Sequence, residues 1–457
     1  MDGGVLLDGL ALLVRELALF AAFGFLVLGA SDLLVDFIWI GLKLKRLLLR
    51  VRPASLESLP PPKSPGRLAI FVPTWREEAV IGKMLARALR VWNGADFRIF
   101  VGCYPNDAAT IAAVEAIDDR RVQMVIGARE GPTTKADNLN SLWCALRVAE
   151  ARGDAFKAVI LHDAEDVVHS AELALFDRMI ERFDLVQLPV LPLPDPGSRL
   201  TAGSYLDEFA ESHGKELVVR EALGAGIPSA GVGCAISREA IGLLAAANDA
   251  PFDAESITED YEMGLKLHAL GRRAAFVRLP AGESGGVVAT REHFPATWRA
   301  AVTQKSRWIA GIALSGWDRL GWSGGLAERW MRLRDRQTLL AALLLVVAYL
   351  TLLAMPLLAF AADQARHPIV LMTPLLGTLM TVAAVLLVWR LVMRFAFVAR
   401  GYGFIEGLRA VPRVIVSNAI AIMAAREALS RYARARRTGA AEWGKTTHVF
   451  PDQVPAE

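Results

Sequence analysis

The chain has 457 residues, of which 51 are basic and 48 acidic, so its formal net charge is +3. Hydrophobic residues make up 54% and charged residues 22%, compared with about 45–50% and about 25% in soluble domains. A net charge this small does not indicate nucleic-acid binding. The surplus of apolar residues is concentrated at the two ends of the chain, which excludes a plain soluble enzyme or a disordered chain. The three cysteines, Cys103, Cys144 and Cys234, form no zinc-site spacing. We expect them to be buried thiols in a reducing compartment.

Three apolar stretches are long enough to cross a bilayer, which needs about 20 residues. The acidic start MDGGVLLDGL does not resemble a secretory signal. The first span is predicted at about 17–42, within an N-terminal segment 1–52. It carries Asp32 and Asp36 on one helical face, which either marks the membrane boundary or packs against protein. The second and third spans are predicted at 338–362 and 368–389, within a segment 338–394.

Charge asymmetry predicts the orientation of these spans. Basic residues flank one end of each: Lys43, Lys45, Arg46, Arg50 and Arg52 after the first, Arg332, Arg334 and Arg336 before the second, and Arg390, Arg394 and Arg400 after the third. We therefore expect a multi-pass protein of a bacterial inner membrane, with the N-terminus outside and the middle of the chain in the cytoplasm. A further apolar stretch, 414–425, is too short to span, so 395–457 is predicted to be a cytoplasmic interfacial helix and tail.

The middle of the chain alternates between strand and helix patterns. After a Pro/Ser-rich linker at 53–66, strands are predicted at 68–74, 97–103, 122–128 and 158–166, with helices at 77–89, 108–117 and 136–151 between them. This alternation predicts an α/β domain, 67–294, with a mostly parallel sheet covered by helices on both faces. Ligands of such sheets bind at the carboxyl ends of the strands, which is where the polar segments 74–78, 104–107 and 162–166 fall.

The most acidic of these segments is His162-Asp163-Ala164-Glu165-Asp166. Three carboxylates at one strand end repel one another, so they need a cation or protons. Hard oxygen ligands suit Mg²⁺ or Mn²⁺ shared with substrate phosphates. The alternative is a solvated loop that caps the helix beginning near Ser170.

Two later motifs each allow a structural and a chemical interpretation. Thr258-Glu259-Asp260 precedes a helix pattern and is typical of a helix cap; a carboxylate placed there in a pocket would serve as a general base. Gln304-Lys305-Ser306-Arg307-Trp308 lies on an amphipathic stretch, 297–314, in a segment 295–337 of predicted interfacial helices. This motif is either a membrane anchor or an arginine for diphosphate beside a ring for sugar stacking.

In this order and between membrane helices, D-A-E, T-E-D and Q-x-x-R-W resemble the membrane-embedded family 2 glycosyltransferases, which include cellulose and hyaluronan synthases. The segments FVPTWREEAVIG, GCYPNDAAT, KADNLN, HDAEDVVH and WGKTTHVFP are most similar to the glycosyltransferase part of the phage adsorption protein B group. Members of that group often carry an extra C-terminal regulatory domain, which we do not expect in a sequence ending at Glu457.

The resemblance implies a GT-A (Rossmann-like) domain inserted between transmembrane helices, a nucleotide-sugar donor, which we expect to be UDP-linked, and Mg²⁺ or Mn²⁺. By matching motifs, it implies roles for the donor side of the site: Thr74, Trp75 and Glu77 for the nucleotide base, Asp107 for the nucleoside, Lys135 for the nucleotide or diphosphate, and Asp163 and Glu165 for metal and the diphosphate of the nucleotide sugar, with Asp166 as a substitute ligand. It also implies Asp260 as catalytic base, and Glu259, Gln304, Arg307 and Trp308 for diphosphate and acceptor. Gly231, Gly233 and Cys234 would lie near the acceptor or form a tight turn, and His293 would be an extra metal or phosphate contact or a structural residue.

The implied activity is inverting transfer, with processive exopolysaccharide synthesis coupled to export as the main hypothesis. Three spans are few for a wide conduit, so a dimer or an export partner would complete it. Transfer of one sugar to a lipid carrier is the nearest alternative, and a catalytically silent membrane scaffold or receptor is the alternative from another class.

Overall fold

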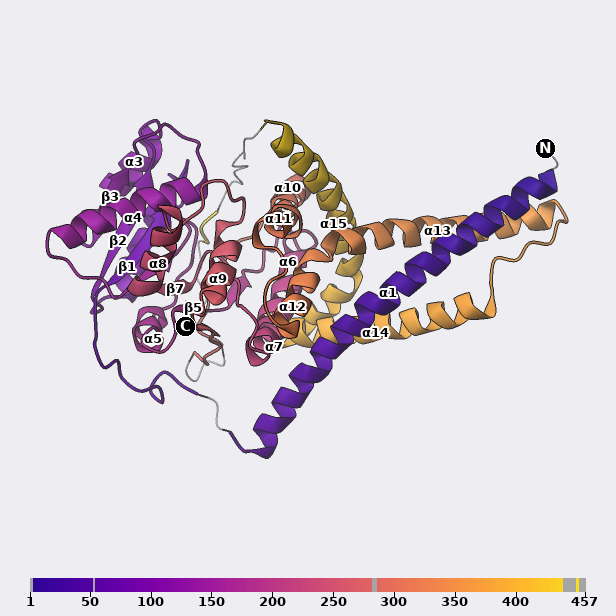
Figure 1. Cartoon of the computed structure of the whole chain (residues 1–457), viewed down its shortest axis with the longest axis horizontal. Helices are drawn as coiled ribbons and strands as arrows, with labels where there is room; N and C mark the ends of the chain where they lie inside the picture. Colours follow the sequence, from indigo (N-terminus) through magenta and orange to yellow (C-terminus); the bar gives the residue numbers. More distant parts are fainter. Residues whose placement is uncertain (1–2, 52–53, 282–285, 439–448, 452–457) are drawn as a thin grey trace.

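The computed structural model describes residues 3–51, 54–281, 286–438 and 449–451. Most of the predicted motif at 443–451 lies outside these residues. An α/β domain lies at one end, and three long helices extend together from the other end (Figure 1).

The central sheet has seven strands in the order β3-β2-β1-β4-β7-β5-β8. Its strands are β1 (Leu68–Pro73), β2 (Phe97–Cys103), β3 (Val122–Ile126), β4 (Ala158–Leu161), β5 (Leu185–Gln187), β7 (Cys234–Ser237) and β8 (Ala274–Phe276). The first four are parallel, as predicted, whereas β7 runs antiparallel between β4 and β5. A separate parallel pair joins β6 (Val190–Pro192) to β9 (Thr290–Glu292).

Helices cover both faces of the sheet because alternate strand residues point to opposite sides. One core packs α2 (Ile81–Val91), α3 (Ala108–Glu115) and α5 (Glu172–Met179) against side chains such as Ile70 and Ile99. The other packs α4 (Lys135–Ala151), α8 (Arg238–Asn248) and α9 (Glu259–Ala269) against side chains such as Phe71 and Phe100. The fold is therefore the mixed α/β, GT-A-like arrangement that was expected.

Two helical segments connect this domain to the long helices. The first comprises α6 (Gly203–Glu211), the π-helix η1 (Ser212–Glu216) and α7 (Leu217–Ala222). The second comprises α10 (Trp298–Ile309), the π-helix η3 (Ala310–Ser315), α11 (Gly316–Leu320) and α12 (Leu326–Arg336). The amphipathic stretch predicted at 297–314 is thus helical throughout most of its length.

Four helices in the described part of the chain are long and apolar enough to cross a membrane: α1 (Gly3–Leu48), α13 (Thr338–Gln364), α14 (Pro374–Tyr402) and α15 (Phe404–Thr438). The first three extend side by side, while α15 crosses near their base, beside α10 (Figure 1). Contrary to expectation, the stretch 414–425 belongs to a helix that is long enough to span, whereas its interfacial position on the cytoplasmic side stays a prediction. The helix continues well beyond its apolar centre, because charged side chains do not interrupt helical hydrogen bonding and Arg413 is buried against Asp207 and Glu406.

The carboxylates of Asp32 and Asp36 bind protein partners where α1 meets the rest of the molecule. Asp36 is 2% exposed; it accepts hydrogen bonds from Lys215 Nζ at 2.6 Å and Trp389 Nε1 at 2.8 Å. Asp32 pairs with Arg334 at 3.0 Å and also with Arg390. These contacts favour the packing interpretation of the acidic face.

Candidate active site

The predicted site residues at the carboxyl ends of β1 and β2 fall into two groups. Thr74 and Asp107 organise the loops: the Thr74 hydroxyl donates to the Gly102 carbonyl at 2.8 Å, and Asp107 accepts from the Arg76 amide at 2.6 Å while capping α3. Trp75 and Glu77 line the main cavity instead. The ring of Trp75 packs edge-on against Tyr104, with centroids 5.2 Å apart.

Lys135 and Asp163 form an ion pair in this cavity, with Nζ and Oδ1 2.6 Å apart. Lys135 is the first residue of α4, and Thr134 caps that helix by accepting from the Asp137 amide. Burial lowers the pKa of Lys135, but the carboxylates of Asp163 and Glu259 outweigh that effect and raise it. The ammonium group therefore stays charged beside the acidic strand end.

Asp166 lies in a different, buried network rather than along the cavity wall. His162 Nδ1 is 2.7 Å from Asp166 Oδ2, and His162 Nε2 is 3.1 Å from Glu172 Oε1. Against the effect of burial, Glu172 and Asp166 raise the pKa of His162 to about 10. Asp166 also accepts a hydrogen bond from the Asp163 amide at 3.1 Å. Its partners thus make it a support for the loop that carries Asp163, which does not favour the predicted role as a substitute metal ligand.

Two further carboxylates that line the cavity are those of Glu165 and Glu292. Burial and neighbouring carboxylates, chiefly Asp166 and Glu165, raise the pKa of Glu292 well above its ordinary range. Such crowding is relieved by a bound cation, and the oxygen donors suit Mg²⁺ or Mn²⁺. Among the described residues no three acidic, histidine or cysteine side chains already converge at metal-binding distances. The donor set fits a divalent ion that is shared with a substrate.

The T-E-D segment begins α9 and faces the same cavity. Thr258 occupies the N-cap position, but its hydroxyl makes no capping bond. Burial, joined by the Asp260 carboxylate, raises the pKa of Glu259 to about 8. Burial also raises the pKa of Asp260, and the Lys135 ammonium partly offsets that effect. Asp260 Oδ1 accepts from the Tyr261 amide at 2.7 Å, which fixes the orientation of the carboxylate.

Gly231 lies directly against this carboxylate. Its φ is +76°, and a Cβ placed on it would be 2.4 Å from Asp260 Oδ2. Gly233, with φ of +56°, faces Thr290 and Glu172 instead, and Cys234 is buried in the sheet. Of the three predicted neighbours of the acceptor, Gly231 is the one at which an added Cβ would meet the Asp260 carboxylate. The expectation of three buried thiols holds for two, because Cys144 is exposed.

Gln304, Arg307 and Trp308 line the cavity from α10. Gln304 Oε1 and Arg307 Nε are buried, and neither has a hydrogen-bond partner in the described part of the chain. Burial lowers the pKa of Arg307, while Glu259 opposes that shift. Trp308 belongs to a cluster of aromatic rings, whose other members are Tyr205, Phe209 and Phe294.

The cavity that joins these residues has a volume of about 1420 Å³, larger than the roughly 300–1,000 Å³ of a typical small-molecule site. It runs from Asp163 and Asp260 past Trp308 and on between α1, α13 and α14. The sequence analysis did not single out Glu292, which lines the cavity, or Glu172, which lies beside His162 behind the strand end. Glu292 lies within the REHFP segment and His162 within HDAEDVVH, but neither segment reveals which side chains meet in space.

Residues 65–311, more than half of the chain, match the family model described as glycosyltransferase like family 2. The chain belongs to this family. It is also 36% identical over 469 aligned residues to the bacteriophage adsorption protein B of Escherichia coli K12 and to the bacteriophage N4 adsorption protein B of Escherichia coli O157:H7. The match covers 96% of this chain but 62% of each relative. The chain therefore spans less than two thirds of the length of these relatives.

Among solved structures, this family 2 glycosyltransferase is similar to a mannosyltransferase from Pyrobaculum calidifontis in complex with GDP-Man and Mn²⁺. The identity is 16% over 93% of this chain and 99% of that chain, with a TM-score of 0.49. It is also similar to S. aureus TarS in complex with UDP-GlcNAc, at 12% identity over 77% of this chain and 92% of that chain, with a TM-score of 0.35.

Proposed function

We propose that this glycosyltransferase moves a sugar from a nucleoside diphosphate, UDP in our hypothesis, to an acceptor hydroxyl with inversion at the anomeric carbon. The observation that carries the proposal is one cavity lined by a fixed carboxylate, Asp260, an acidic strand end at Asp163, and a buried arginine, Arg307. A base, an acidic site for a cation and a cation for diphosphate are the three components that such a transfer requires.

Asp260 acts as the base in this proposal. Its Oδ1 is held by the Tyr261 amide, so Oδ2 accepts the proton of the acceptor hydroxyl as that oxygen attacks the anomeric carbon. The bond to the diphosphate breaks on the opposite face, which inverts the configuration. Burial raises the pKa of Asp260 and strengthens it as a base, whereas Lys135 opposes its protonation.

The donor is bound at the acidic strand end. Trp75 and Glu77 contact the nucleotide base, and Lys135 and Arg307 stabilise the negative charge that builds up on the departing diphosphate. Asp163 and Glu165, with Glu292, would hold Mg²⁺ or Mn²⁺. When bound, the ion neutralises charge on the diphosphate.

The extent of the cavity supports repeated addition. Beyond Trp308 it continues between α1, α13 and α14, so an acceptor longer than one sugar would remain next to the base after each transfer. In this proposal the product is an exopolysaccharide that leaves across the inner membrane, with the help of a second copy or an export partner. The catalytic domain and α15 lie on the cytoplasmic side.

A second candidate is transfer of a single sugar to a lipid carrier. The part of the cavity between the long helices is lined by apolar residues such as Leu28, Leu352 and Met355, which would suit a hydrocarbon chain. The size and solubility of the product separate the two candidates.

The test uses membranes that hold the full chain, a panel of radiolabelled nucleotide sugars, and Mg²⁺ or Mn²⁺. We expect one donor to yield a long, water-soluble product. Asp260→Asn is expected to lower kcat by about 10²- to 10⁴-fold with little change in donor KM. The matched control is Asp249→Asn, at an exposed residue that ends α8.

Near-normal turnover by Asp260→Asn would refute the assignment of the base. A small, organic-extractable product would instead favour the lipid carrier. Donor binding by the wild-type protein without transfer from any donor would favour the scaffold alternative.

A further inference from the structure

A group of basic side chains lies outside the candidate active site, where α1, α14 and the segment after β8 meet. We call it the basic patch and define it by the residues Lys43, Arg46, Arg278 and Arg400. All four side chains are exposed, and none of them lines the cavity. Lys43 and Arg46 belong to the last two turns of α1, Arg400 to the last turn of α14, and Arg278 follows β8.

Aromatic packing brings the ends of α1 and α14 together. The ring centroids of Trp39 on α1 and Phe397 on α14 are 5.0 Å apart. Lys43 lies one turn beyond Trp39, with its Nζ 5.5 Å from the centroid of that ring. Arg400 lies three residues beyond Phe397, and residues at this spacing are neighbours on a helix surface. The two helices therefore present their cations at the same place.

A third element adds Arg278 to the patch. Its guanidinium donates a hydrogen bond to the carbonyl oxygen of His213 in η1. The next residue, Gly214, packs so closely against Phe397 that a Cβ placed on it would lie 2.7 Å from Cδ1 of that ring. Contacts through η1 thus place Arg278 beside the end of α14, although Arg278 and Arg400 are far apart in the sequence.

The basic patch has a surplus of positive charge. The charged groups that act on Lys43 are the cations of Arg400, Arg46 and Arg278, and Arg400 also acts on Arg278. Glu221 supplies one negative charge near Arg46. In the part of the chain that the structure describes, no member of the patch forms an ion pair with a carboxylate. Because like charges repel one another, an added anion would stabilise this arrangement.

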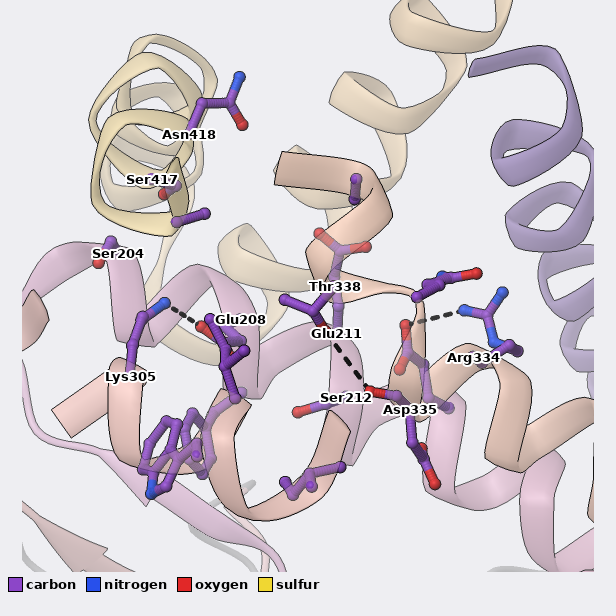
Figure 2. Close-up of a pocket in the computed structure, with 18 of the residues that line it drawn as sticks. Ser204, Glu208, Glu211, Ser212, Lys305, Arg334, Asp335, Thr338, Ser417 and Asn418 are labelled. Atoms are coloured by element: carbon purple, nitrogen blue, oxygen red, sulfur yellow. Dashed lines mark hydrogen bonds and ion pairs between the residues drawn. The ribbon is translucent and has the colours of Figure 1, made fainter. Parts of the chain in front are cut away.

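Several cations along the cavity differ from those of the patch, because they have carboxylate partners. Figure 2 shows one such pair, Lys305 with Glu208, on the cavity wall. Lys215 and Arg394 both pair with Glu211. The chain itself neutralises these cations, whereas the basic patch is left to an anion from outside the protein.

The location of the basic patch indicates the kind of anion. The patch follows the apolar parts of α1 and α14, two helices that are long enough to cross a membrane. A cluster of at least four basic side chains beside such a helix is typical of a binding site for acidic phospholipids. Beside the apolar parts, Phe37 contacts Trp389, with centroids 6.4 Å apart, and is 57% exposed. Exposed apolar side chains are thus available to the acyl chains of a lipid.

We propose that the basic patch binds the phosphate group of an acidic phospholipid, in the membrane leaflet next to the α/β domain. Arginine side chains suit this ligand because they can form two parallel hydrogen bonds to phosphate oxygens. One lipid would then link α1, α14 and the segment after β8. The inference depends on the proposed membrane arrangement but not on sugar transfer, so binding alone tests it.

The test uses purified full-length protein in micelles of an uncharged detergent. Phosphatidylglycerol is titrated in, and native mass spectrometry counts the lipid molecules bound at each concentration. Phosphatidylcholine, inorganic phosphate and glycerol phosphate are the comparison ligands. We expect saturable binding of phosphatidylglycerol that weakens at high salt, and much weaker binding of the other three. Arg278→Gln and Arg400→Gln should each raise the Kd of phosphatidylglycerol by about 5-fold.

The matched control is Lys45→Gln, because Lys45 is exposed on the same helix as Lys43 and Arg46 but is outside the patch. It removes the same charge and should bind phosphatidylglycerol as the wild type does. Arg400→Lys keeps the charge and should bind nearly as well as the wild type, which separates loss of charge from damage to the fold.

Three results would overturn the inference: equally tight binding of phosphatidylcholine, equally tight binding of inorganic phosphate or glycerol phosphate, or an equal loss of binding in Lys45→Gln. The second of these would make the patch a site for a soluble anion. Release of the wild-type protein from membranes by alkaline carbonate would instead overturn the membrane arrangement on which the inference depends.

Discussion

Replacing Gly231 by alanine tests whether the position of Asp260 controls the rate. Gly231 has φ of +76°, and a new Cβ would lie 2.4 Å from Asp260 Oδ2 and 3.1 Å from Asp260 Cβ. Ordinary contact begins at 3.4 Å, so the carboxylate must move by 3.4 − 2.4 = 1.0 Å. Such a movement would disturb the 2.7 Å hydrogen bond that Asp260 Oδ1 accepts from the Tyr261 amide.

A misplacement of about 1 Å in a catalytic group costs on the order of 10²-fold in rate. We therefore expect Gly231→Ala to lower kcat about 100-fold, with a much smaller change in donor KM, because Trp75 and Glu77 lie on the loop that follows β1. The side chain also adds left-handed backbone strain of about 1–2 kcal/mol. That strain lowers stability and needs its own control.

Gly271→Ala supplies this control. Gly271 has φ of +72°, almost the same as Gly231, and a Cβ placed on it would meet nothing within 4 Å. Initial rates of sugar transfer in membranes, normalised to the amount of folded protein, compare the two variants. Gly271→Ala should stay within about twofold of the wild type, because strain without a clash at the base leaves the catalytic geometry intact. Wild-type turnover by Gly231→Ala, or an equal loss in both variants, would refute the reasoning.

Three further outcomes are expected. Because the Lys135 ammonium lowers the pKa of Asp260, Lys135→Met should raise that pKa. The acidic limb of the pH profile of kcat/KM should then move to higher pH, and an unmoved limb would contradict the coupling between the two residues. Chelation with EDTA should abolish transfer, and Mg²⁺ or Mn²⁺ should restore it; full activity in EDTA would exclude the metal. Arg413→Met should destabilise the protein by about 3–5 kcal/mol in thermal unfolding, because it leaves Asp207 buried without its bidentate partner. The control is Arg409→Met, at a side chain that is 40% exposed, which should lower the stability by about 0–1 kcal/mol.

The strands that sequence periodicity predicted are those that pair in parallel within the first half of the sheet. Each of these four is a run of apolar residues followed by a polar segment, a pattern that depends only on local sequence. β5 and β8 have three residues each, too few for a period to show, and β7 is antiparallel. The pairing of β7 depends on contacts with β4 and β5, which are far away in the chain.

The helix ends were predicted less well for a similar reason. Hydropathy registers the apolar centre of α15, but the helix extends to Thr438 and includes Pro412. In the sequence, Arg413 has the pattern of a solvated charge. In the fold it is fully buried, because Asp207 on α6 and Glu406 supply its partners.

In the candidate site, too, local motifs predicted single residues but did not predict contacts between distant segments of the chain. Motif matching named Asp163, Asp260 and Arg307, and the structure brings all three to one cavity. Motif matching could not indicate that Asp166 would face His162 or that Glu292 would approach from β9. The approach of β9 arises from the packing of segments more than a hundred residues apart in the chain.

The contacts around Asp260 link the α/β domain to the helical segments that lead to α13. The Tyr261 hydroxyl donates to Asp335 on α12 at 2.6 Å, and Asp335 also pairs with Arg220 at 2.9 Å. On the other side of the T-E-D segment, Thr258 packs against Gly311 of η3 so tightly that a Cβ there would lie 2.4 Å from it. Close-packed contacts transmit displacement. The segment that carries Asp260 is thus held between α12 and η3, so the position of its carboxylate depends on helical segments that lead into the long apolar helix α13.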